Sequence, residues 1–232
     1  MSANEQTSVT TRALFLNNKL ATILAIAPLG VWTFAHLWAN LTAFRGADGW
    51  QKAVTGHQHP VAAIVTAIVV MLPLLIHTAW GLTRIFYMAP NNISYGYFGN
   101  LKYLLQRLSA IGVLFFVGAH VFLAFVQPRM SLGHAELFAD LAREMRTPLT
   151  LSVYLLGTLA VCYHLSNGLA TTAMSLGLTT ERRALRRIET FSIFVFAVML
   201  SMAWGSIYAL HAAGAPPPPA PVTAPDSVPS SE

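Results

Sequence analysis

Five long apolar stretches, separated by short polar segments, account for most of the chain. They cover residues 20–41, 61–83, 104–126, 149–171 and 190–210. Each has about twenty residues, which as a helix rising about 1.5 Å per residue crosses a hydrocarbon core of about 30 Å. The pattern therefore predicts an all-α integral membrane protein, with five transmembrane helices in one bundle over residues 20–211.

Both ends of the chain differ from this bundle. Residues 1–19 are polar and lack the apolar core and cleavage site of a signal peptide, so we expect a polar tail and a first span that is retained. Residues 212–232 contain a proline run at 216–219 and are predicted to form a disordered tail.

The composition agrees with a membrane protein. Hydrophobic residues make up 55% of the chain and charged residues 10%, whereas soluble domains carry about 25% charged residues. The net charge of +5 does not indicate nucleic-acid binding, because in a membrane protein the placement of Lys and Arg carries the information. The single cysteine, Cys162, excludes an internal disulfide or a cysteine-held iron–sulfur cluster, and we expect it to pack in the fourth span.

Lys and Arg are unevenly distributed between the polar segments on the two sides of the predicted membrane. Nine of the 14 Lys and Arg lie in the N-terminal tail and the second and fourth loops, and five lie in the first and third loops. Since cytoplasmic segments carry the excess of basic residues, we predict a cytoplasmic N-terminus and an external C-terminus.

Two local features are expected within this topology. Pro28 and Pro73 lie inside spans, where neighbouring helices tolerate proline, so they should kink the helices without breaking them. Residues 131–146 in the third loop read as a short amphipathic helix on the outer surface. Its apolar positions near helical spacing are Leu132, Leu137, Leu141 and Met145.

One histidine lies in each of the first four spans, about sixteen residues from its start: His36, His77, His120 and His164. An ionisable residue is costly in hydrocarbon and is a functional hypothesis by default. Because successive spans run in opposite directions, helix geometry puts His36 and His120 near the outer surface and His77 and His164 near the inner one. The two levels are roughly 18 Å apart.

This separation predicts which histidines act together. Two ligands of one iron must share a level, so His36 pairs with His120 and His77 pairs with His164. Neutral imidazole is a good ligand for iron, and helix bundles build cofactor sites from facing helices. We therefore predict two haem b groups stacked across the membrane as an electron-transfer path. Small residues near the histidines suit the space that a porphyrin needs: Gly30, Ala35, Gly81, Gly118, Ala119, Gly157 and Gly168.

Other interpretations of the polar residues stay open. Membrane histidines also make interhelical hydrogen bonds, relay protons or bind metal, as in a haem-free transporter or assembly factor. The predicted spans contain no Asp or Glu, which argues against a proton pump or an ion-coupled transporter. Arg84, two turns after His77, is either a partner for a propionate of the inner haem or a positive-inside anchor.

Four further histidines are expected at or near the outer surface: His57, His59, His134 and His211. They are either solvated or, in the case of His57 or His59 together with Asp48, positioned to exchange protons with a quinone near the outer haem. The distance between their levels argues against a zinc or copper site that uses all four span histidines, although either pair could bind a metal alone.

Two segments carry a resemblance to a known family. The sequence YHLSNGL at residues 163–169, followed by Gly177, resembles the fourth-helix motif of the five-helix, two-haem cytochrome b membrane anchors of succinate dehydrogenase and fumarate reductase (complex II). His36-Leu37, followed by Asn40, is similar to the helix that carries the first ligand. The resemblance covers about residues 15–210.

The resemblance implies a role in a larger complex of a bacterial cytoplasmic membrane. It implies axial ligation of the outer haem iron by His36 and His120 and of the inner haem iron by His77 and His164. A flavoprotein and an iron–sulfur subunit would bind at the cytoplasmic face and deliver electrons from succinate. These electrons would pass through the haems to a quinone, menaquinone being expected for the five-helix type. The chain by itself would bind no succinate.

Related complexes are the remaining alternatives. Some fumarate reductases of this type carry a glutamate in the fifth helix that is linked to transmembrane proton transfer. The predicted fifth span contains no acidic residue, which weakens the case for such a pathway. We expect oxidation of succinate as the direction of the assembled complex. A cytochrome b anchor of a hydrogenase or a formate dehydrogenase is the other alternative. Those anchors commonly place their ligands on fewer helices than the four used here.

Overall fold

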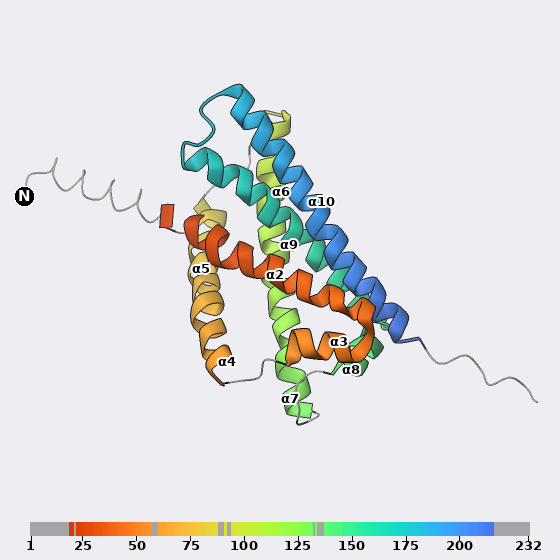
Figure 1. The fold of residues 1–232 in the computed structure, drawn as a ribbon. Helices are drawn as coiled ribbons and strands as arrows, with labels where there is room; N and C mark the ends of the chain where they lie inside the picture. Colours follow the sequence, from red (N-terminus) through yellow and green to blue (C-terminus); the bar gives the residue numbers. More distant parts are fainter. Residues whose placement is uncertain are drawn as a thin grey trace, which may run out of the picture.

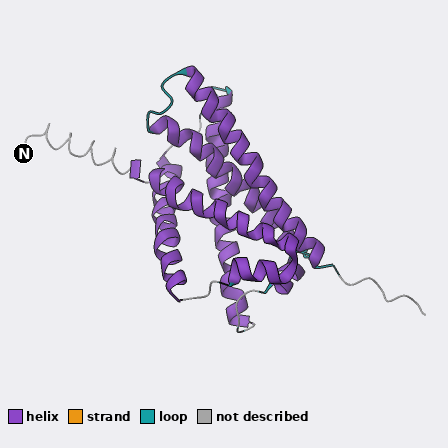
Figure 2. Ribbon diagram, in the orientation of Figure 1, coloured by secondary structure: helices purple, strands orange, loops and turns teal. Residues whose placement is uncertain are grey.

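The computed structural model consists of helices joined by short loops in the part of the chain that it describes (Figure 1). It describes residues 19–20, 22–56, 60–87, 91, 94–131, 133 and 137–215. No strand occurs in these residues, as Figure 2 shows, which confirms the predicted all-α class. The tails over residues 1–18 and 216–232 and the loop histidines His57, His59 and His134 lie outside the described residues.

Within the described residues, five helices are long and apolar enough to cross a membrane, as predicted. They are Thr22–Thr55, Ile64–Ile85, Phe98–Ser131, Pro148–Ser175 and Arg182–Ala213. The helices continue past most ends of the apolar stretches, because backbone hydrogen bonding does not stop where the side chains become polar. Glu189 and Asp48, which lie outside the predicted spans, therefore fall within these longer helical segments.

The first segment changes its helical type along its length. It consists of the π-helical η1 (Ala25–Gly30), α2 (Val31–Asn40), the 3₁₀-helical η2 (Leu41–Arg45), α3 (Gly46–Trp50) and the π-helical η3 (Gln51–Thr55). Gly46 has a φ of 81°, a left-handed conformation that favours glycine. The chain turns at this point, so that α3 does not continue along the axis of α2 (Figure 1).

In three spans a proline lies within a π-helical turn or two residues after one. Pro28 lies within η1. The second segment comprises α4 (Pro60–Thr66), the π-helical η4 (Ala67–Met71) and α5 (Leu72–Tyr87), which contains Pro73. The third comprises α6 (Phe98–Val121), the π-helical η5 (Phe122–Val126) and α7 (Gln127–Ser131), which contains Pro128. A proline cannot donate to the carbonyl four residues earlier, and wider turns accommodate this loss. The helices are thus altered but not broken, as expected.

The remaining two spans are regular and pack closely. α9 (Pro148–Ser175) contacts both α6 and α10 (Arg182–Ala213) and lies between them (Figure 1). Its buried residues are mostly small, which lets the helix backbones approach one another. They are Tyr154, Gly157, Thr158, Cys162, Ser166, Ala170 and Ala173. Cys162 is fully buried against Met199 and Ala203, which confirms its predicted packing role.

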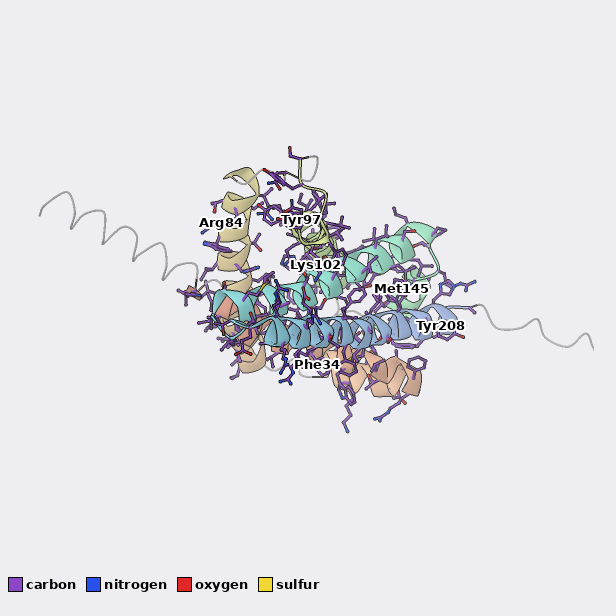
Figure 3. All side chains as sticks on the ribbon, turned by 90° about the horizontal axis from the view of Figure 1, so that it is seen from above. Phe34, Arg84, Tyr97, Lys102, Met145 and Tyr208 are labelled. Atoms are coloured by element: carbon purple, nitrogen blue, oxygen red, sulfur yellow. The ribbon has the colours of Figure 1, made fainter. Side chains whose placement is uncertain are left out.

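Short helices pack over the C-terminal end of α10 and cover that end of the bundle. We use "the cap" for α3, η3 and α8 (Phe138–Glu144). Trp50 and Met145 are 1% and 0% exposed in the cluster that joins the cap to α10, where Met145 lies beside the helix in Figure 3. The backbone N–H of Phe138 donates to Oε1 of Gln51 over 2.9 Å, which fixes α8 against η3.

The amphipathic helix predicted for residues 131–146 is shorter in the structure. Leu141 and Met145 are buried as predicted, whereas Leu137 is 41% exposed because it precedes the first helical residue of α8. Phe138 and Ala142 complete the buried face instead. Leu132 lies outside the described residues.

The contact between α6 and α9 provides a test of the fold. A Cβ atom added to Gly157 would overlap the ring of Phe116, which lies directly against this position. Gly157→Ala is therefore expected to lower the free energy of unfolding by about 1–3 kcal/mol, the usual cost of overpacking. Thermal unfolding in detergent measures this change.

Gly205→Ala in α10 is the matched control, because its new methyl group would meet its nearest neighbour, in Phe44, at an ordinary 3.6 Å. Equal stability of the two variants would contradict the close approach of α6 and α9.

Candidate functional site

The four span histidines lie in two pairs. His36 of α2 and His120 of α6 have ring centroids 5.9 Å apart, with an angle of 69° between the ring planes. His77 of α5 and His164 of α9 have centroids 6.2 Å apart at 70°. These are the pairs that the depth argument predicts. The structure thus brings together side chains from four different helices, two at a time.

Both pairs have a spacing suitable for one metal ion between two imidazoles. A first-row metal ion lies about 2 Å from a bound imidazole nitrogen, so two such rings on opposite sides of an ion have centres roughly 6 Å apart. No group of three or more His, Cys, Asp or Glu that could hold a metal ion occurs among the described residues. A two-ligand site suits haem iron, because the porphyrin supplies the other four nitrogen donors.

A glycine leaves space beside His77. A Cβ added to Gly81, one turn after His77, would meet nothing within 4 Å, and such an opening is what the edge of a porphyrin requires. Gly118 is also open, but it lies two residues before His120 and therefore faces away from it. A Cβ at Gly157 would overlap Phe116, and one at Gly30 would contact Leu165 at 3.5 Å, so these two glycines lie at helix contacts.

His120 is held by aromatic residues of α6 and α9. Its Nδ1 lies 3.2 Å from the hydroxyl of Tyr154. The ring of Phe116 stacks on it with centroids 5.6 Å apart, and Phe116 in turn meets Tyr154 edge to face. Tyr154 is 7% exposed and belongs to the same buried cluster as the cap residues.

His36 is fixed by residues of its own segment. Trp32, one turn earlier, stacks on its ring at 4.7 Å with an angle of 8°. Asn40 donates from Nδ2 to the backbone carbonyl of His36 over 2.9 Å and lies 3.4 Å from Nε2 of the ring. Trp50 of the cap donates from Nε1 to Oδ1 of Asn40 over 3.1 Å, which orients the amide.

His164 lies in a polar cluster between α6 and α9. Its Nδ1 is 3.3 Å from the backbone carbonyl of Gln106 and 3.4 Å from Oγ of Ser109. The side chain of Gln106 donates to the His164 carbonyl over 3.1 Å and accepts from Nδ2 of Asn167 over 2.7 Å. The motif residue Asn167 therefore acts on His164 through Gln106.

The surroundings of His77 include Arg84 only indirectly. The ring of Trp80 lies 6.4 Å from that of His77, and the guanidinium of Arg84 stacks over Trp80 at 4.9 Å. Figure 3 shows Arg84 on α5 and Lys102 on α6. The Arg84 side chain is partly buried, so it is available for either of the two roles that the sequence suggests.

The end of the bundle near His164 contains an ion pair that the sequence analysis missed. Lys102 of α6 and Glu189 of α10 are 2.6 Å apart and about one-third exposed. The predicted fifth span began at residue 190, so it left out Glu189, an acidic residue that the structure places within α10. The opposite charges of these two side chains neutralise each other.

The other polar residues considered above lie at the opposite end. His211 donates from Nδ1 to the carbonyl of Met145 and accepts at Nε2 from Nη1 of Arg146, each over 2.9 Å. It therefore ties the end of α10 to the segment before α9. Asp48 is exposed on α3. A separate cavity of about 280 Å³ lies between α2, α9 and α10, and its lining is apolar, including Phe34, Leu165 and Met199.

Comparison with known proteins identifies the family. Residues 97–204 match the family model described as succinate dehydrogenase/fumarate reductase transmembrane subunit. A succinate dehydrogenase cytochrome b558 subunit of Bacillus subtilis is 30% identical over 188 residues, which cover 81% of this chain and 92% of the relative. This chain belongs to that family. No solved structure matches.

Membership of the family confirms the resemblance found in the sequence. The chain is a multi-pass membrane protein and a cytochrome b anchor of a succinate dehydrogenase or fumarate reductase. This implies haem binding and association with the other subunits of such a complex. The matched region contains His120 and His164, whereas His36 and His77 precede it.

Sequence reasoning found the four histidines but missed the residues that orient them. Gln106 carried a usable signal, because it is an uncharged amide inside an apolar stretch and must find a polar partner. Tyr154 and Trp50 carried none, because aromatic residues in or near membrane helices are common and their spacing does not identify a partner.

The cap generates a prediction about pH. Burial raises the pKa of Glu144, the neighbouring Asp140 raises it further, and Arg143 opposes them. A raised pKa in the folded state means that ionisation of Glu144 costs stability as the pH rises above the ordinary carboxyl range. Glu144→Gln is therefore expected to be more stable than the parent protein at pH 7, with the difference vanishing at about pH 4.

Thermal unfolding across this pH range measures the effect. A stability difference that grows on acidification would have the wrong sign and would contradict the burial of Glu144.

Proposed function

We propose that this chain is the di-haem cytochrome b subunit of a succinate:quinone oxidoreductase, in which it passes electrons between the iron–sulfur subunit and a membrane quinone. The observation that carries the proposal is the presence of two imidazole pairs, with ring centres 5.9 Å and 6.2 Å apart, on four different helices. His36 and His120 would ligate the outer haem iron, and His77 and His164 the inner one.

Bound haem supplies a one-electron carrier whose potential depends on its axial ligands and on the hydrogen bonds that these make. The residues of this chain hold and orient the ligands. Trp32 and Phe116 keep the rings of His36 and His120 from rotating by stacking on them. Gly81, one turn after His77, leaves room beside the proposed inner site.

The direction of the path follows from the proposed topology. With the N-terminus in the cytoplasm of a bacterium, the His77–His164 pair lies near the inner surface, where a flavoprotein and an iron–sulfur subunit would bind. The His36–His120 pair lies near the outer surface beneath the cap, and we place the quinone, expected to be menaquinone, in this region. Oxidation of succinate by the assembled complex is the favoured direction, and the chain itself contributes no succinate site.

The ligand assignment is tested by haem content. The parent protein is expected to contain two b-type haems per chain in a reduced-minus-oxidised spectrum with haem quantitation. His36→Ala and His77→Ala should each lose one haem, and not the same one, because each removes a ligand of a different pair. His211→Ala, which removes a histidine of the cap end, is the control and should retain both.

Two results would reject the assignment. Folded parent protein without haem absorbance would favour a haem-free transporter or assembly factor. A chain that keeps both haems in the two alanine variants would show that other residues are the ligands.

Arg84 is proposed as a partner for a propionate of the inner haem. Loss of a positive charge near a haem stabilises its oxidised form, so Arg84→Gln is expected to lower the midpoint potential of the inner haem alone. A redox titration measures both potentials, and Arg129→Gln, on an exposed position of α7, serves as the control. Unchanged potentials would leave Arg84 as a positive-inside anchor.

A further inference from the structure

We propose that α6 and α9 act as reciprocal positioning helices, each orienting the histidine that the other carries. Tyr154 of α9 fixes the ring of His120 on α6, and Gln106 of α6 fixes the ring of His164 on α9. This inference rests on the proposed two-haem function. It adds a positioning role for Tyr154 and Gln106, which contact the proposed ligand histidines but would not contact iron.

The contacts of His164 suit the tautomer that haem ligation would require. Its Nδ1 has three polar neighbours: the Gln106 side-chain amide nitrogen at 3.2 Å, the Gln106 backbone carbonyl at 3.3 Å and Oγ of Ser109 at 3.4 Å. Ligation of iron through Nε2 would require Nδ1 to carry the hydrogen and to donate it to the carbonyl, which can only accept. Nε2 then keeps its lone pair for a metal ion. The Gln106 amide is itself oriented, because its oxygen accepts from Asn167 and its nitrogen donates to the His164 carbonyl. This cluster joins two turns of α6 and α9 and holds the imidazole plane.

His120 is likewise contacted by a polar side chain of the neighbouring helix, here a tyrosine in place of a glutamine. Its Nδ1 lies 3.2 Å from the Tyr154 hydroxyl, which can accept the Nδ1 hydrogen that ligation through Nε2 would require. Tyr154 meets both His120 and Phe116 edge to face, at 5.7 Å and 5.6 Å. The ring of His120 therefore lies in an aromatic corner that permits one orientation.

The reciprocity follows from the antiparallel packing of the two helices. α6 runs from Gln106 to His120, and α9 runs from Tyr154 to His164, so each helix presents its polar positioning residue opposite the histidine of its neighbour. A hydrogen bond to the second nitrogen of a ligating histidine fixes its tautomer and raises its basicity. α6 and α9 thus form the preorganised half of both sites, while α2 and α5 each contribute the second histidine.

The test compares Tyr154→Phe and Gln106→Leu in the full-length protein, each with both haems bound. The midpoint potential and the low-spin ferric electron paramagnetic resonance signal of each haem are the measurements, because the signal depends on the angle between the two imidazole planes. His36→Ala and His77→Ala assign the two signals to the outer and inner haem.

Each variant should change one haem only. Tyr154→Phe removes an acceptor from Nδ1–H of His120 and is expected to raise the potential and shift the signal of the outer haem. Gln106→Leu should shift the signal of the inner haem. Asn167→Leu, which leaves Gln106 in place without its orienting partner, should shift the inner signal in the same direction by a smaller amount.

Tyr163→Phe is the matched control, because Tyr163 lies beside His164 in sequence but packs on Phe196 of α10 at 6.3 Å. It should leave both signals unchanged. Two haems with unchanged signals and potentials in Tyr154→Phe and Gln106→Leu would overturn the inference and leave the di-haem function intact. Equal shifts of both haems in either variant would also overturn it. Retention of both haems in His36→Ala and His77→Ala would instead reject the ligand assignment.

Discussion

Imidazole nitrogens inside a hydrocarbon layer must be coordinated or hydrogen-bonded, because burying an unsatisfied polar group costs roughly 2–7 kcal/mol. Polar side chains lie against three of the four span histidines and answer that requirement. Asn40 lies against His36, Tyr154 against His120, and Gln106 with Ser109 against His164. In the tautomer that ligation through Nε2 would require, Nδ1 of His120 and of His164 can donate to these partners while Nε2 keeps its lone pair. The same interactions that make the histidines tolerable in the membrane therefore prepare them as ligands.

Close approach of α6 and α9 makes these contacts possible. The ring of Phe116 occupies the space that a side chain at residue 157 would fill, so a glycine at this position lets Phe116 stack on His120. The small residues Cys162 and Ser166 serve the opposite face of α9, where α10 packs and Ser192 donates to the Ser166 carbonyl. α9 is thus held on two sides, and the positions of Tyr154 and His164 are set by both neighbours.

Much of this arrangement could be predicted from the sequence, but its supporting contacts could not. Length and hydropathy determine the number of spans, and matched depth determines which histidines meet, because both follow from the rise of a helix and the thickness of a membrane. The bounds were too short, since a helix does not end at the last apolar residue, and Glu189 was left outside α10 for this reason. Contacts such as that of Tyr154 with His120 depend on the rotation of each helix about its axis. A period of 3.6 residues in a uniformly apolar segment does not specify that rotation.

The surroundings of the two histidine pairs differ. This asymmetry fits an electron-transfer path whose donor and acceptor bind at opposite ends of the bundle. Near the outer pair, Trp50 of the cap donates to Asn40, which contacts His36, and Tyr154 belongs to the buried cluster beneath α8. Both outer histidines are therefore connected to the cap through one intervening side chain. The inner pair has no such cover among the described residues, and the ion pair of Lys102 on α6 with Glu189 on α10 is about one-third exposed. An iron–sulfur subunit that docks on the surface needs an accessible end of the bundle. A quinone dissolved in the membrane needs a structured site with little water. The proposed assignment of donor to the inner end and quinone to the outer end gives each terminus the environment that its partner requires.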